Sequence, residues 1–143
     1  MKILALAVAV AAMSAAQSGG ASITGSWTAQ FEGRTFLRLD LKLVDGTIIG
    51  AMSSGNIEVD KQGAVRRVTD VPRELRPIFD VTYRESTVTF FRKDTDDSAP
   101  DRFELRLVDP THAELHVFLS AEDLKGLADA GVPPPKPIPL TKQ

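Results

Sequence analysis

Hydrophobic and polar residues alternate along most of the chain from Ile23 onward. In the first such segment, the residues on one side are apolar or small: Ile23, Gly25, Trp27, Ala29 and Phe31. A period of two residues is typical of β-strands that bury one face. The pattern therefore predicts a first strand with the single tryptophan on its buried face.

The next segment predicts a β-hairpin and its register. Leucines at positions 37, 39, 41 and 43 alternate with charged residues, and Asp45-Gly46 follows, a pair favoured in type I′ turns. Pairing Val44 with Thr47 across that turn places Leu43 opposite Ile48, Leu41 opposite Gly50 and Leu39 opposite Met52. All six residues then point to one side, so turn and alternation predict the same register.

Further strands are predicted in short segments separated by turn residues. They cover 57–59, 65–69, 79–83, 88–90, 103–107 and 113–117. Strand propensity falls after Val132 because of the prolines, although Ile138 and Leu140 are compatible with one additional edge strand. Phe79, Val81 and Tyr83 are expected to face one way. Residues 71–77 are bracketed by prolines and predict a connection, with or without one helical turn. Ser120 resembles the start of a capping box before a helix of about 120–130, which Gly131 ends.

Nine candidate strands joined by short turns favour an all-β, antiparallel up-and-down meander. Closure removes exposed sheet edges, so a small barrel of about 8–10 strands with one short C-terminal helix is preferred to an open sandwich. The barrel domain is expected to span residues 23–143, including a proline-rich tail, after a flexible leader at 17–22.

The first 16 residues predict a signal peptide. Lys2 precedes an apolar run of about 11 residues, too short to span a bilayer, and Ser14-Ala15-Ala16 offers small residues for cleavage before Gln17. The alternative is a buried N-terminal helix. The prediction places a mature chain of about 127 residues in the periplasm or outside the cell.

Composition limits the partners of such a chain. It contains no cysteine, so neither disulfides nor a lipid-modified cysteine is available, and the core must hold the domain together. Loss of the one charge of Lys2 moves the formal net charge from −2 to −3, spread over both signs. That balance does not favour nucleic acid or an anionic membrane as a partner, and it does not predict an oligomeric state.

Ile23-Thr24-Gly25-Ser26-Trp27 resembles the Gly-x-Trp opening of the calycin barrels, the lipocalins and avidins. The resemblance extends through the Asp45-Gly46 hairpin to Gly50 and implies a barrel with a Trp plugging one end. This chain has one Trp, and Met52 and Ala29 stand where avidins place polar contacts, so biotin is not the expected ligand. The chain is shorter than a lipocalin, although a helix at 121–130 is similar in placement.

Polar motifs offer few catalytic or metal sites. In His112-x-Glu114-x-His116, the two histidines would lie about 13 Å apart along a strand, too far for one zinc ion. Pairing Leu105 with Leu115 instead sets Arg106 opposite Glu114, and Glu104 opposite His116. Four acidic residues in the 94–101 loop lack the pattern of a calcium hand and are expected to be solvated: Asp94, Asp96, Asp97 and Asp101.

The predicted function is non-covalent binding of a small apolar or amphipathic molecule, without a cofactor. The predicted binding residues point into the barrel: Trp27, Leu39, Leu41, Gly50, Met52, Val81, Tyr83, Phe90, Leu105 and Leu115. Gly50 is expected to leave space for the ligand. Arginines of the middle segment are candidates for contact with an anion or for a solvated face: Arg66, Arg67, Arg73 and Arg76. The alternative is a packed barrel that serves protein interaction, and an enzyme is the third choice.

Overall fold

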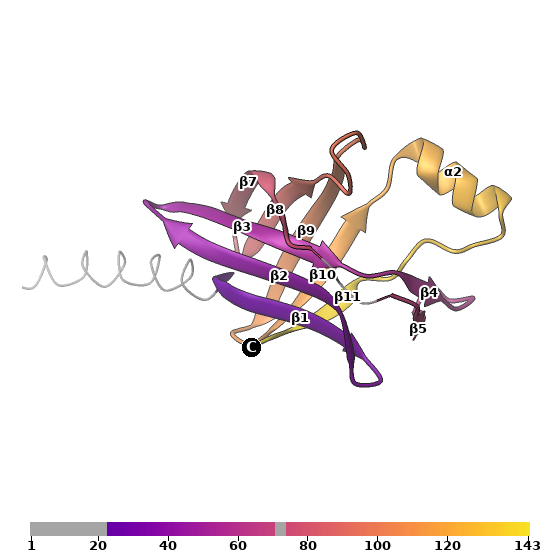
Figure 1. Cartoon of the computed structure of the whole chain (residues 1–143), viewed down its shortest axis with the longest axis horizontal. Helices are drawn as coiled ribbons and strands as arrows, with labels where there is room; N and C mark the ends of the chain where they lie inside the picture. Colours follow the sequence, from indigo (N-terminus) through magenta and orange to yellow (C-terminus); the bar gives the residue numbers. More distant parts are fainter. Residues whose placement is uncertain (1–22, 71–73) are drawn as a thin grey trace, which may run out of the picture.

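The chain from residue 23 onward forms a strongly curved antiparallel sheet from which a small hairpin and a helix project (Figure 1). The computed structural model describes residues 23–70 and 74–143. The predicted signal peptide and leader (1–22) and part of the proline-bracketed connection (71–73) lie outside the described residues. The strands are β1 (Gly25–Phe31), β2 (Arg34–Val44), β3 (Thr47–Ser54), β4 (Ile57–Val59), β5 (Val65–Val68), β6 (Arg76–Pro77), β7 (Phe79–Arg84), β8 (Thr87–Arg92), β9 (Asp101–Asp109), β10 (His112–Phe118) and β11 (Ile138–Lys142).

Nine strands share one sheet, in the order β6, β3, β2, β1, β11, β10, β9, β8, β7. Its two edge strands, β6 and β7, are consecutive in the chain and separated only by Ile78, whose N–H donates to the Gly50 carbonyl at 3.0 Å. The sheet therefore curls until its two edges approach each other. An antiparallel meander, nearly closed into a barrel, confirms the predicted fold class.

Both predicted hairpin registers are confirmed. Across β2 and β3, Leu41 pairs with Gly50 and Leu39 with Met52. Across β9 and β10, Leu105 pairs with Leu115 as expected. Arg106 lies opposite Glu114 and Glu104 opposite His116, as predicted, and the Arg106 guanidinium forms an ion pair with Glu104 of its own strand.

Four register irregularities interrupt the ladders of the described strands, and the ones in β2 and β7 affect the predicted pattern most. Ala29 pairs with Leu37 but Gln30 pairs with Thr35, so Phe36 is the extra residue in β2. Phe36 and Leu37 are consequently both buried although they are neighbours. A bulge changes which way the following side chains point, which alternation alone does not reveal.

The bulge in β7 corrects the prediction for that strand. Phe79 pairs with Phe91 and Thr82 with Thr89, which leaves one extra residue in β7, and Asp80 has a positive φ of 49°. Phe79 therefore stacks on Phe91 outside the barrel, with ring centroids 6.1 Å apart. Phe79, Val81 and Tyr83 do not share one face.

The last strand is internal to the sheet and not an edge strand as predicted. β11 pairs with β10 along Ile138–Thr141 and with β1 at Thr28 and Trp27. Pro139 has no N–H to donate, and the β1 pairing stops before it reaches that residue. Proline is thus accommodated where the ladder to β1 has already ended.

Helix α2 (Ala121–Asp129) projects from the barrel and buries none of its residues. The predicted cap is present, because Asp123 N–H donates to Ser120 Oγ at 3.0 Å. Gly131 takes a positive φ of 71°, and Val132 N–H donates to the Leu127 carbonyl, which closes a Schellman motif. Of the helices in the described part of the chain, none has the length and apolarity to span a bilayer.

Candidate functional site

The interior of the barrel is filled by its own side chains. Seven of the predicted binding residues are 0–2% exposed: Trp27, Leu39, Leu41, Met52, Phe90, Leu105 and Leu115. If a void large enough for a water molecule lay beside these side chains, part of their surface would be accessible to water. Their near-zero exposure therefore indicates that no such void borders them. The structure does not test a binding role for these residues, and a ligand among them would have to displace packed groups.

Gly50 does not leave space for a ligand, contrary to expectation. A Cβ atom at this position would lie 2.0 Å from the carbonyl oxygen of Asp40 on the neighbouring strand. The glycine therefore allows two backbones to approach closely, a role common where a curved sheet bends. The space opposite Leu41 is occupied by main chain.

Val81 and Tyr83 lie at the seam where the edge of β3 meets β7. With Leu43 and Ile48 they border a recess of about 280 Å3 beside the β2–β3 turn. Tyr83 is 37% exposed and lies outside the enclosed core. The bulge at Asp80 turns Phe79 outward, whereas Tyr83 still pairs with the buried Val88 and Val81 packs against the core.

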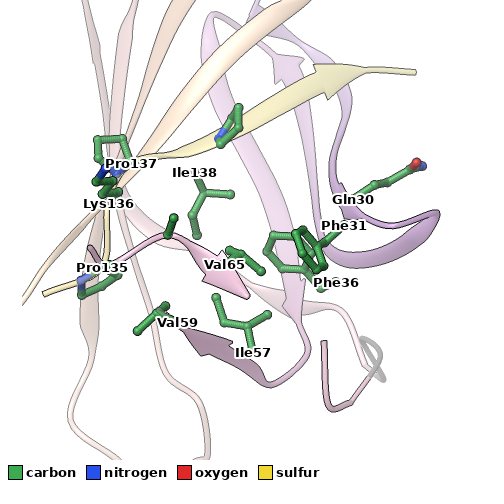
Figure 2. Close-up of a pocket in the computed structure, with 13 residues that line it drawn as sticks. Gln30, Phe31, Phe36, Ile57, Val59, Val65, Pro135, Lys136, Pro137 and Ile138 are labelled. Carbon is green, nitrogen blue, oxygen red and sulfur yellow. The ribbon is translucent and has the colours of Figure 1, made fainter. Parts of the chain in front are cut away.

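An apolar cleft lies beside the β4–β5 hairpin, between the β1–β2 turn and the start of β11. Figure 2 shows side chains from β1, β2, the hairpin and the segment before β11 converging on it. Its volume is about 250 Å3. Apolar groups dominate its lining: Phe31, Phe36, Ile57, Val59, Val65 and Ile138. We call this the side cleft.

Local features of the sequence build the side cleft. The bulge at Phe36 lets this residue line the cleft while its neighbour Leu37 stays buried elsewhere. The proline-rich segment forms the opposite wall, fixed by Lys136 N–H donating to the Gly63 carbonyl at 3.0 Å. Gly63 has a φ of 85°, and a Cβ there would lie 2.4 Å from the Pro134 carbonyl oxygen. A glycine is required for this close approach.

Polar groups at the side cleft are few. Gln30 and Lys136 contribute to its lining among the apolar side chains. Both residues are exposed, so their polar ends can remain in water while their stems border the cleft. An apolar pocket with a few polar groups is the usual form of a site for a small molecule.

The arginines predicted to contact an anion are not gathered at one place. Arg66 projects from β5 and pairs with Glu58 at 2.8 Å, and Arg67 is also exposed. Arg73 lies outside the described residues. Of these four arginines, only Arg76 lines a polar cleft of about 310 Å3, which lies at the end of the barrel where β3 and β8 end and β6 begins. We call this the mouth cleft.

The mouth cleft also contains Arg92, which the sequence analysis missed. Its side chain is 7% exposed, and burial lowers the pKa of its guanidinium from the ordinary value. A signal was present, since alternation from Val88 through Phe90 places Arg92 on the inward face of β8. Ser54, Asn56, Asp70 and Glu74 complete the polar lining with Asp94.

The two histidines of the His112-x-Glu114-x-His116 motif contact different acidic side chains. His112 Nδ1 lies 2.9 Å from Asp109 Oδ1 at the β9–β10 turn, and His116 Nε2 lies 3.5 Å from Glu114. Within residues 23–70 and 74–143, no three His, Cys, Asp or Glu side chains converge as a metal ion would require. In the acidic loop, Asp94 and Asp96 face arginines.

Comparison with known proteins adds no functional assignment. No protein-family model matches the sequence, and no curated protein or solved structure is significantly similar to it. Functional inference therefore depends on the two clefts and on the chemistry of their linings.

Proposed function

We propose that this protein binds a small apolar or amphipathic molecule non-covalently in the side cleft. The observation that carries the proposal is the contrast between a filled interior and an open apolar cleft beside it. Phe31, Ile57 and Val65 are partly exposed and present apolar surface there, which favours the transfer of an apolar group out of water. Gln30 and Lys136 offer contacts for a polar end of the molecule.

The size of the probe bounds the affinity to expect. Drug-sized ligands gain roughly 0.3 kcal/mol per non-hydrogen atom, so a probe of about 20 atoms gains about 6 kcal/mol. That free energy corresponds to a Kd on the order of tens of micromolar. Anilinonaphthalene sulfonate suits this range, because its aromatic part matches the apolar walls and its sulfonate can face Lys136.

A substitution that fills the side cleft tests the proposal. Ala64 lines the cleft, so Ala64→Phe should place a ring in it and weaken the dye by at least about tenfold. Ala121→Phe makes the same change at an exposed position of α2 and should leave dye binding unaltered. Unchanged dye affinity in a folded Ala64→Phe protein would exclude the side cleft as the site.

The natural ligand is addressed by a separate measurement. Protein purified from its own host and examined by native mass spectrometry should carry a small molecule, and Ala64→Phe should reduce its occupancy. The same preparation tests the proposed export, because the mature mass should correspond to a chain that begins at or near Gln17. Recovery of intact Met1 from the host would contradict export.

A protein-interaction role is a second candidate, supported by an aromatic row on the outer wall. Phe79, Phe91, Arg102 and Phe118 are successive cross-strand neighbours on β7, β8, β9 and β10. Phe79 and Phe118 are 37% and 40% exposed, and the Arg102 guanidinium lies 4.6 Å from the Phe118 ring centroid. Exposed aromatic and arginine side chains are enriched at interfaces. A photo-crosslinker at Phe118, but not at exposed Val108, should then trap one defined partner in the host.

A further inference from the structure

A charged side chain is enclosed at one end of the barrel. Arg92 is the last residue of β8 and follows the inward-facing Val88 and Phe90. Its guanidinium carbon lies 5.7 Å from the ring centroid of Phe103, which is itself buried. A cation in such a position is normally held by hydrogen-bonded partners of opposite charge.

Arg92 lacks a full set of such partners. Its Nε atom is buried and has no hydrogen-bond acceptor. Its ionic partner is Asp94, whose Oδ1 lies 3.6 Å from Nη2, beyond hydrogen-bond range, and whose side chain is 73% exposed. Buried polar groups in proteins are nearly always bonded, so this guanidinium retains capacity for another acceptor.

A second guanidinium lines the same cleft. Arg76 donates from Nη2 to Asp96 Oδ1 at 2.8 Å, and Asp96 is 98% exposed. Burial is the main cause of the lowered pKa of the Arg92 guanidinium. The charges of Asp94 and Asp101 raise this pKa, and the nearby charge of Arg76 lowers it further. Two like charges facing one space favour an anion between them.

We propose that the mouth cleft binds the carboxylate of a small hydroxy acid or amino acid, which accepts hydrogen bonds from Arg92 and Arg76. Asp96, which accepts a hydrogen bond from Arg76, and Asp94, the ionic partner of Arg92, would act as internal substitutes for this carboxylate. This site is separate from the side cleft and does not depend on the proposed function.

The other groups of the cleft restrict the ligand. Asp70, Glu74 and Asp94 also line it, and their negative charges disfavour a dianion such as phosphate. Ser54 and Asn56 add neutral polar groups that can bond a hydroxyl or an ammonium beside the carboxylate. A monocarboxylate that carries a hydrogen-bond donor therefore fits this cleft better than a polyanion.

Side-chain NMR of the folded protein tests the proposal with glycolate and inorganic phosphate as probes. Glycolate should shift the Arg92 Nε–H resonance in a saturable way, and phosphate should shift it less at equal concentration. Arg76→Gln removes a charge-assisted bond and should weaken glycolate roughly 10- to 100-fold. Asp96→Asn removes the internal competitor and should tighten glycolate by roughly two- to fivefold.

Arg66→Gln provides the matched control, because Arg66 is exposed and pairs with Glu58 on the hairpin. It should leave the glycolate response unchanged. The absence of a saturable shift at Arg92 would overturn the proposal, as would an equal response in Arg76→Gln. Tighter binding of phosphate than of glycolate would overturn the assignment of a carboxylate ligand. None of these measurements requires a substitution of Arg92, so they can be interpreted even if such a substitution prevents folding.

Discussion

Gly50 and Asp40 lie so close across β2 and β3 that a Cβ atom on Gly50 would sit 2.0 Å from the Asp40 carbonyl oxygen. Gly50→Ala should therefore force the two strands apart and destabilise the fold by about 1–3 kcal/mol or more. Denaturant unfolding measures the loss. Gly126→Ala is the matched control, because nothing lies near its Cβ position in α2, and it should stabilise by roughly 0.5–1 kcal/mol. Equal effects of the two substitutions would refute the close-approach role.

Trp27 combines complete burial with a hydrogen bond to the main chain. Its Nε1–H donates to the Ile23 carbonyl at 2.9 Å, and Lys142 Nζ lies 5.6 Å from its ring centroid. Trp27→Ala should cost about 3–5 kcal/mol. Trp27→Phe keeps an aromatic ring but leaves the Ile23 carbonyl without this donor, so it should cost about 1–3 kcal/mol. Wild-type fluorescence should be blue-shifted and resistant to quenchers, and red-shifted emission would contradict burial.

Asp109 should make stability depend on acid pH. The Thr111 N–H, at 2.8 Å, and the His112 ring hold the pKa of this carboxyl at about 2, below its usual 3.8. A folded-state pKa below the unfolded value stabilises the fold above about pH 4, and this contribution is lost as the pH falls through about 2.

The difference in unfolding free energy between wild type and Asp109→Asn should therefore shrink steadily from about pH 4 to pH 2. Denaturant melts at a series of pH values measure it. An NMR titration of the Asp109 carboxyl supplies the direct check, and a midpoint at the usual 3.8 would contradict the lowered pKa.

The filled interior predicts a cavity penalty. Leu115 is 0% exposed, so Leu115→Ala should leave a cavity and cost about 2–5 kcal/mol. Leu124→Ala on the exposed face of α2 should change the unfolding free energy by about 0.5 kcal/mol at most. A similar small change for Leu115 would show that the interior is looser than the burial of its side chains indicates.

Those parts of the fold that depend on local pattern were predictable from the sequence. The β2–β3 register follows from the Asp45-Gly46 turn and from alternating leucines, which constrain the same pairing independently. The helix cap at Ser120 is equally local. Neither feature requires knowledge of a distant segment.

Features that depend on distant neighbours were not predicted. The residues around Asp80 carry no local signal of a bulge. The sequence around Ile138 and Leu140 likewise does not reveal that β11 pairs with β1 on its second edge. The side cleft was missed for the same reason, because its walls come together from distant parts of the chain. The adjacent apolar pair of Phe36 and Leu37 was its one local signal.

The pairing of β11 with β1 also constrains how the protein folds. Trp27 pairs with Lys142, and the Gln143 N–H donates to the Ser26 carbonyl at 2.8 Å, so the ladder joins segments from opposite ends of the domain. Contacts so distant in sequence impose a large loop-closure entropy and slow folding. A chain emerging N-terminus first from a ribosome must therefore keep β1 unpaired on one side until residues 138–143 have appeared.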